Sequence, residues 1–556
     1  MEDIEIAQKA TLKPIKEIAN NLDIPESSLT LHGDYIAKVS HGLLQNLRQE
    51  KDGKLVLVTA MSPTSAGEGK TTNSIGLSMA LNKLGKRSMV TLREPSIGPI
   101  MGIKGGAAGG GYSQVLPMED INLHFTGDMH AISLAHNLLS AVIDAHIKFG
   151  NVLGLDPTRI YWPRAMDMND RALRGIIVGL GGHSNGYPRE DNFIITAASE
   201  IMAILCLATS ISDLKKRLGD IVVGRDYSRE FVKAKSLKMH GAMTALLKHA
   251  LNPNLVQTIE GTPAFVHGGP FANIAHGTNS LIATKLALKL SDYVVTEAGF
   301  GAELGGEKFL DFVSQTGKFD PSAVVLVASI RALKSNGGVS NKELDVENIG
   351  ALEKGFENLR IHYENMRKYN VPVIVALNKF DNDTYNEIEA FARLCEENNI
   401  IYEKSDVWKN GSRGGMELAQ RVVDEIESSN EKKFRPLFSL DEPIEKKIEK
   451  LAKEIYRASG VNYESSARKK LKLFKEHGYG NLPVIVAKTQ YSVTDNADIK
   501  GAPDDYTFNI RDLTLSAGAG FIVAVAGNIL LMPGLPKIPG ATKIDVDEDG
   551  TISGLF

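Results

Sequence analysis

The stretch "KLVLVTAMSPTSAGEGKTTNSIGLSMALNKLG", residues 54–85, constrains the fold more than any other part of the chain. Its apolar run 55–59 is rich in β-branched residues and is closed off by Pro63, which predicts a buried strand. After the loop, apolar residues return with a mostly helical spacing, and we expect this helix to end at Gly85. A strand, a glycine-containing loop with Lys-Thr and a helix form the setting of a phosphate-binding loop.

This loop has the chemistry to bind a nucleoside triphosphate. Its backbone N–H groups and the helix N-terminus favour an anion, Lys70 can reach the terminal phosphates, and the Thr71 hydroxyl can ligate Mg²⁺. The predicted binding residues are Thr64, Ser65, Ala66, Gly67, Glu68, Gly69, Lys70 and Thr71. Because Thr64 stands where the common pattern has glycine, an ordinary strand–turn–helix connection is the alternative.

The rest of the chain predicts an α/β protein built on parallel sheets covered by helices. Short apolar runs such as "SMVTL", "DYVVTEAG", "AVVLVAS", "VPVIVALN" and "LPVIVAK" alternate with helical patterns such as "GGMELAQRVVDEIESS". Shifts in glycine and charge content divide the chain into a phosphate-loop domain, residues 1–360, and two smaller α/β domains, residues 361–482 and 483–556.

Composition and charge limit the class of partner. The chain has 63 basic and 67 acidic residues among 556, a balance that gives no sign of a nucleic-acid partner. The two cysteines cannot build a disulfide framework or a Cys/His metal cluster. The amino terminus lacks an apolar signal region, and the apolar core 518–532 is shorter than the roughly 20 residues of a membrane span. We therefore expect a cytoplasmic protein without a membrane partner, in which residues 518–532 form buried strands.

Charged residues beside the predicted strands are further candidates. Arg93 and Glu94 follow the second strand, where an arginine can clamp an anionic intermediate and a carboxylate can hold a magnesium-bound water. A surface ion pair between these two neighbours is an equally good interpretation. Asp128 lies close to His130 and could do acid–base work, although such a pair is more often a structural hydrogen bond.

Aromatic residues in loops after strands point to a flat ligand. Phe300 lies between two glycines, Phe380 follows "VIVALNK", and Trp408 stands in a polar, glycine-containing loop. Taken singly, each is more simply explained by packing; together they favour stacking on a heteroaromatic substrate.

Taken together, these segments resemble the formate–tetrahydrofolate ligase family. The similar stretches follow the family's order from about residue 55 to 540. They are "TSAGEGKTT", "REPSIGPIMGIKGGAAGGG", "FTGDMHAI", "DNFIITAASEIMAILCL", "GGPFANIAHGTNS", "VTEAGFGAELGGEKF", "IRALKSNGG", "LPVIVAKTQYS" and "MPGLPKIPG". The family's loop likewise begins with threonine, which accounts for Thr64.

The resemblance implies a ligase that uses ATP and Mg²⁺ to join formate to tetrahydrofolate through formyl phosphate, giving 10-formyltetrahydrofolate, ADP and phosphate. It implies that Lys70 stabilises the phosphates, that Arg93 holds formyl phosphate with support from Glu94, and that Asp128 lies near the folate or the formyl centre. Phe300, Phe380 and Trp408 match the family's pterin-stacking aromatics. The resemblance also implies a homotetramer stimulated by a monovalent cation such as K⁺ or NH₄⁺.

The chain departs from the family pattern mainly on the expected folate side. Asp381 and Asn382 replace an apolar pair beside Phe380, and Ser412 and Arg413 stand near Trp408 where glycine and glutamate are usual. Two rival functions remain: a phosphate-loop ligase for another carboxylate, and a nucleotide-dependent switch ATPase. The first does not need three stacking aromatics, and the second predicts hydrolysis stimulated by a macromolecule.

Overall fold

A computed structural model describes residues 2–64, 67–102, 108–429 and 433–555 of the chain. Ser65 and Ala66 of the predicted phosphate-binding loop lie outside the described residues.

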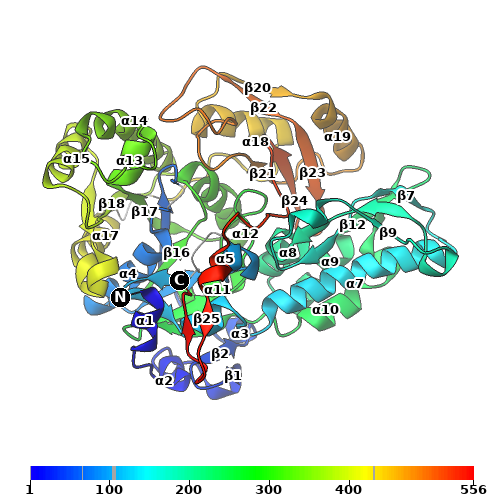
Figure 1. Cartoon of the computed structure of the whole chain (residues 1–556), viewed down its shortest axis with the longest axis horizontal. Coiled ribbons are helices and arrows are strands. Elements are labelled where there is room, and N and C mark those ends of the chain that lie inside the picture. The colour runs from blue at the N-terminus through cyan, green and yellow to red at the C-terminus, as the bar shows by residue number, and fades with distance from the viewer. Residues whose placement is uncertain (1, 65–66, 103–107, 430–432, 556) are drawn as a thin grey trace.

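The centre of the molecule is one large, mostly parallel sheet (Figure 1). From one edge to the other its main strands are β1 (Leu29–His32), β2 (Ile36–Val39), β14 (Asn254–Thr258), β15 (Pro263–Val266), β4 (Ser88–Leu92), β16 (Tyr293–Glu297), β3 (Lys54–Ala60), β17 (Pro321–Ala328), β18 (Val373–Asn378) and β19 (Tyr402–Ser405). Every neighbouring pair from β15 to β19 is parallel, whereas the strands from β1 to β15 pair antiparallel. The predicted α/β class is confirmed.

Helices on both faces explain why the strands of this sheet are continuous apolar runs. Along β3, Leu55 and Leu57 belong to one hydrophobic core, while Val56 and Val58 belong to a second core on the opposite face. A parallel strand that is buried on both faces gains nothing from alternating polar residues. The helix α4 (Lys70–Lys83) supplies apolar residues to the second core, and Gly85 follows it with φ of 81°.

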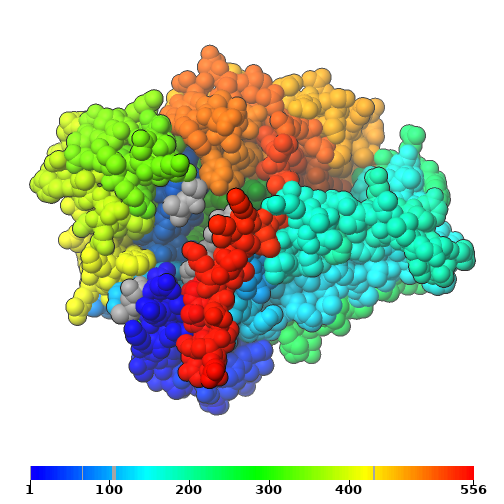
Figure 2. Space-filling view, viewed as in Figure 1, coloured from blue at the N-terminus to red at the C-terminus, as the bar shows by residue number. Residues whose placement is uncertain are grey.

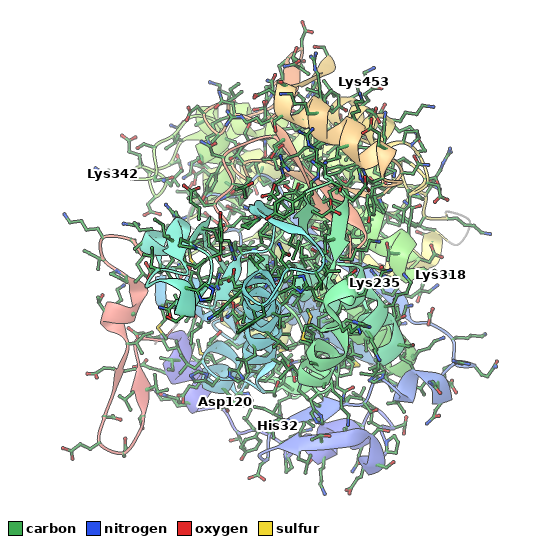
Figure 3. All side chains as sticks on the ribbon, turned by 90° about the vertical axis from the view of Figure 1, so that its right-hand side faces the viewer. His32, Asp120, Lys235, Lys318, Lys342 and Lys453 are labelled. Atoms are coloured by element: carbon green, nitrogen blue, oxygen red, sulfur yellow. The ribbon has the colours of Figure 1, made fainter. Side chains whose placement is uncertain are left out.

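Three further bodies surround the sheet. An arm on the right of Figure 1, residues 128–250, is built on α7 (Asp128–Lys148), α9 (Ile211–Asp220), α10 (His240–Leu247), β7 (Leu155–Ile160), β9 (Ile176–Val178) and β12 (Val222–Asp226). Figure 3 views the molecule from the side of this arm and shows Lys235, whose side chain is solvent-exposed.

The lobe at the upper left contains α13 (Ile330–Asn336), α14 (Ile349–Arg367) and α15 (Tyr385–Glu397), and α17 (Met416–Ser428) lies below it. The lobe at the top contains α18 (Ile444–Lys450), α19 (Ser465–Glu476), β20 (Gly460–Tyr463), β21 (Val484–Ala487), β22 (Thr507–Ile510), β23 (Asp512–Ser516) and β24 (Phe521–Val525).

The two ends of the chain lie side by side. The Gln8 side chain donates to the backbone oxygen of Ile552 over 2.8 Å, beside the hairpin of β25 (Asp545–Val546) and β26 (Ile552–Ser553). Figure 2 shows the face of the molecule hollowed between this C-terminal segment and the two upper lobes.

Two sequence predictions can be compared directly with these elements. The central sheet includes two strands from beyond residue 361, β18 and β19. The division of the chain into domains at residues 360 and 482 stays a prediction. Within the predicted stretch 518–532, β24 is a buried strand, as expected. Its antiparallel neighbour β23 lies before this stretch, and only Leu513 of β23 is fully buried. Among the described residues, no helix has both the length and the apolar character to cross a membrane.

Candidate active site

The described part of the loop between β3 and α4 contains two glycines in a left-handed conformation. Gly67 and Gly69 adopt φ of 82° and 73°, a left-handed conformation that glycine reaches without strain. The N–H of Gly67 donates to the backbone oxygen of Thr64 over 3.2 Å. Lys70 begins α4, so its side chain and the first free N–H groups of the helix lie at the same end.

A carboxylate that sequence reasoning missed, Glu297, joins the residues of this loop to Arg93. The Thr71 hydroxyl donates to Glu297 Oε2 over 2.8 Å, and Arg93 Nη2 lies 3.9 Å from Glu297 Oε1. Glu297 ends β16, the strand beside β3, and its side chain is almost fully buried. The sequence "VVTEAGFG" could have revealed Glu297, because an acidic residue ends an apolar strand there. Glu94 stands in a similar place, two residues after the end of β4.

Opposing effects act on the Lys70 ammonium. Burial lowers the pKa of Lys70, and the charges of Glu297 and Glu68 act in the opposite direction. The Lys70 side chain is half-buried, so its charge is partly compensated by two carboxylates and is still within reach of an anionic ligand.

Arg93 is placed to hold an anion. A Cβ on Gly299 would lie 3.2 Å from both Nη1 and Nη2 of Arg93, so the guanidinium packs directly on this glycine. Its Nε is buried and, within the part of the chain that the structure describes, has no hydrogen-bond partner. A guanidinium with an unused donor suits a multi-oxygen anion such as a phosphate.

Arg93 and Glu94 do not form the ion pair with each other that the sequence left open, because Glu94 faces a different group. The pKa of Glu94 is raised well above its usual value, first by burial and then by the charge of Asp128. Asp128 begins α7 and accepts from Lys38 Nζ, with 2.8 Å to its Oδ1, and from Asn254 over 2.9 Å. His130 is exposed, so the predicted Asp128–His130 pair gives way to a buried Lys38–Asp128 ion pair.

The three predicted stacking residues all follow strands of the same parallel run. Phe300 comes after β16 with φ of 61°, a strained conformation for a residue with a large side chain. Phe380 comes after β18, and the Arg331 guanidinium lies 5.1 Å from the centre of its ring. Trp408 belongs to α16 (Val407–Asn410) after β19, is 44% exposed, and lies against Gly110 and Gly111. These strand ends share one edge of the sheet, where ligands of open α/β sheets bind.

The oxygen atoms at the head of α4 fit a hard divalent cation. Thr71 offers a hydroxyl and Glu297 a carboxylate, whereas no cluster of three His, Cys, Asp or Glu residues capable of holding a metal occurs among the described residues. Mg²⁺ commonly takes one or two protein ligands and completes its shell with water and phosphate oxygens.

Comparison with known proteins decides the family. The family model described as "Formate–tetrahydrofolate ligase" matches residues 1–556. The chain belongs to the formate–tetrahydrofolate ligase family. Curated relatives with this name align with the chain over 99–100% of their own length. The protein of Kosmotoga olearia is 66% identical over 555 residues, covering 100% of both chains. The protein of Thermosipho africanus is 64% identical over 100% of this chain and 99% of its own, and that of Thermotoga maritima is 58% identical over 98% of this chain and 100% of its own.

In this formate–tetrahydrofolate ligase family member, the predicted site residues form separate groups along one sheet edge. Lys70, Thr71 and Arg93 lie around Glu297, and Glu94 and Asp128 lie around Lys38. The catalytic and binding roles of these residues and of the three aromatics stay predictions. Lys38 was also missed by sequence reasoning, since a lysine in the short strand "IAKV" carries no motif.

Proposed function

We propose that this protein joins formate to tetrahydrofolate with ATP, giving 10-formyltetrahydrofolate, ADP and phosphate. The observation that carries the proposal is the convergence of Lys70, Thr71 and Arg93 on Glu297 at the loop end of β3. An ammonium and a guanidinium close to the same carboxylate suit the transfer of a phosphoryl group to a small anion.

The reaction passes through formyl phosphate in this proposal. A formate oxygen attacks the γ-phosphorus of ATP and the bond to ADP breaks, which makes a mixed anhydride. N10 of tetrahydrofolate then attacks the formyl carbon, phosphate leaves, and the N10 proton passes to solvent. Lys70 and the loop N–H groups stabilise charge on the phosphates, while Arg93 binds the formyl phosphate and keeps it beside the folate.

Thr71 and Glu297 are the proposed holders of Mg²⁺, through the hydroxyl and carboxylate oxygens that lie 2.8 Å apart. When bound there, the ion neutralises negative charge on the terminal phosphates of ATP. Stimulation by K⁺ or NH₄⁺ belongs to the proposal on the likeness to the family alone.

Folate is the proposed ligand of Phe300, Phe380 and Trp408. Their place after β16, β18 and in α16 puts three aromatic rings on the sheet edge that also carries the phosphate-binding loop. Stacking on a flat ring uses the faces of such side chains and leaves the reacting N10 free.

A homotetramer in the cytoplasm completes the proposal. The arm exposes several large apolar side chains, among them Phe149, Val152, Ile177, Leu180 and Tyr227, each with more than half of its surface in contact with solvent. Large exposed apolar side chains of this kind are suited to contact with another subunit. The free, buried thiols of Cys206 and Cys395 fit a reducing compartment.

The decisive experiment measures ADP release from the purified protein with Mg-ATP. Formate and tetrahydrofolate are added separately and then together, and 10-formyltetrahydrofolate is quantified in parallel. We expect ADP and 10-formyltetrahydrofolate in equal amounts only when both substrates are present. Release that depends on another carboxylate would favour a different acyl-phosphate ligase, and release indifferent to both substrates would favour a switch ATPase.

A further inference from the structure

Glu68, immediately before Gly69 and Lys70, is a buried carboxylate with three separate partners. Its Oε1 accepts from the N–H of Thr64 over 2.8 Å, and its Oε2 accepts from the hydroxyl of Ser329. Its backbone oxygen accepts from the side-chain amide of Asn378 over 3.3 Å. A carboxylate that is only 1% exposed needs such bonds, because an unsatisfied buried charge is strongly unfavourable. These bonds therefore fix the backbone just before Lys70.

One chain of contacts leads from the Glu68 carboxylate through the Ser329 hydroxyl to Phe380. Ser329 follows β17 and caps α13, because its hydroxyl accepts from the N–H of Ala332 over 3.1 Å. Arg331, in the first turn of the same helix, holds its guanidinium 5.1 Å from the centre of the Phe380 ring. The hydroxyl that bonds to Glu68 thus also sets the start of the helix whose Arg331 side chain lies over the Phe380 ring.

The second connection leads through Asn378. This residue is the last of β18, and Phe380 is two positions further along the chain. A Cβ on Gly69 would lie 2.5 Å from Asn378 Nδ2, so the amide packs directly on the loop backbone. The turn after Asn378 is closed by Asp383, whose Oδ2 accepts from the N–H of Phe380 over 2.8 Å. A shift of the phosphate-binding loop therefore acts on the base of the turn that carries Phe380.

We propose that Glu68, acting through Ser329 and Asn378, is a positioning residue that couples nucleotide binding to folate binding. A nucleotide on the loop fixes Glu68, and a fixed Glu68 holds both supports of Phe380 in place. The pterin then meets an aromatic ring that is already ordered, so that less conformational entropy is lost on its binding. The inference rests on the proposed function, because it takes Phe380 as part of the folate site.

The test is an equilibrium titration of the full-length protein with tetrahydrofolate, with and without a non-hydrolysable ATP analogue and Mg²⁺. The ratio of the two dissociation constants measures the coupling. For the unaltered protein we expect nucleotide to tighten folate binding by about fivefold or more, the lower end of common coupling strengths. Asn378→Ala should bring this ratio close to 1, and Glu68→Gln should reduce it in the same direction.

Two further variants make the result specific. Asn378→Asp keeps the size of the side chain but cannot donate to the backbone oxygen of Glu68, so it should also lose the coupling. It provides a second test of this hydrogen bond if Asn378→Ala folds poorly. Asn365→Ala is the matched control, because Asn365 is a buried asparagine that donates to a backbone oxygen, that of Ile455, over 2.8 Å. This control should keep the coupling of the unaltered protein.

A ratio of 1 in the unaltered protein, or an unchanged ratio in both Asn378 variants, would overturn the inference while leaving the ligase function in place. Failure of the unaltered protein to bind tetrahydrofolate under either condition would instead overturn the proposed function, and this inference with it. The two failures are therefore distinguishable in one set of titrations.

Discussion

The Thr71 hydroxyl donates to Glu297 Oε2 over 2.8 Å and so joins the head of α4 to the end of β16. Because β16 is the direct neighbour of β3, the carboxylate lies beside the loop that β3 leads into. The same carboxylate faces Arg93 and acts on the charge of Lys70. Glu297 is thus shared by the groups proposed for Mg²⁺, phosphate and formyl phosphate.

Glu297→Gln should lower activity without unfolding the protein. The amide keeps the shape and can still accept from Thr71, but it removes the negative charge that would help to hold Mg²⁺. Loss of a group that only supports a metal ligand typically lowers metal affinity or activity by about 10- to 100-fold, and we expect at least this effect for a carboxylate that holds the ion directly. ADP formation measured as a function of Mg²⁺ concentration should show a higher Mg²⁺ requirement. Glu200→Gln, which changes a half-buried carboxylate bonded to the backbone N–H groups of Gly518 and Ala519, should leave that requirement unchanged.

Lys70→Ala should lose turnover while the protein melts normally. The ammonium is matched to charge that develops on the phosphates, and the loss of one such preorganised donor lowers kcat by about 10²- to 10³-fold. Lys83→Ala is the control, since Lys83 lies at the other end of α4 and bonds to the Ser412 hydroxyl. Near-normal turnover of the Lys70 variant would remove the loop from the active site.

Arg93→Ser should abolish ligation while ATP still binds. The Arg93 guanidinium faces Glu297 and packs on Gly299. Arg93 is not part of the loop proposed to bind the triphosphate, so ATP should still bind to the variant. An arginine that stabilises a transferring phosphoryl group can contribute about 10³-fold or more to kcat. ATP affinity from calorimetry and product formation are measured on the same preparation, with Arg87→Ser as an exposed arginine control. If ATP binding disappears together with ligation, Arg93 holds the nucleotide.

Much of the parallel sheet was predictable, and the side-chain partners were not. Apolar runs and β-branched residues locate β3, β4 and β16 to β18 because buried parallel strands need apolar residues on both faces. Helix starts such as Lys70 follow from local turn chemistry. The charged partners of Arg93 and Asp128 could not be predicted in this way. Glu297 and Lys38 are distant in sequence and meet these residues only because of the strand order, which no local pattern specifies.

Trp408→Ala should raise the KM for tetrahydrofolate by about one to two orders of magnitude, if stacking contributes the ~1–3 kcal/mol found for aromatic stacking on nucleic-acid bases. The backbone oxygen of Trp408, which accepts from Tyr112 over 2.7 Å, survives the change, so the local turn should persist. KM values for ATP and tetrahydrofolate are measured side by side. Tyr385→Ala, at an aromatic residue that is 75% exposed, is the control. An unchanged folate KM would assign Trp408 to packing on Gly110 and Gly111.

The pH dependence of folate binding should reflect Asp383. Burial raises the pKa of Asp383 to about 6; the charge of Glu387 also raises it, while the bond from Phe380 and the charges of Lys334 and Arg331 act against this. Above pH 6 the carboxylate is ionised and is a strong acceptor for the N–H of Phe380. Below pH 6 it is protonated, the bond weakens, and the turn that carries Phe380 loosens. We therefore expect the KM for tetrahydrofolate to rise as the pH falls through about 6.

Stability should change in the opposite direction over the same pH range. Because the pKa of Asp383 is higher in the folded protein than in the unfolded chain, its contribution to stability is largest at low pH and is lost as the pH rises through about 6. Asp383→Asn removes this titration but keeps an acceptor for Phe380, so both dependences should flatten. Comparing the two proteins at each pH cancels any titration of the substrate itself. Asp381→Asn, which changes an exposed neighbour paired with Lys409, should retain the dependence of the unaltered protein. Identical KM profiles for Asp383→Asn and the unaltered protein would show that Asp383 does not control the position of Phe380.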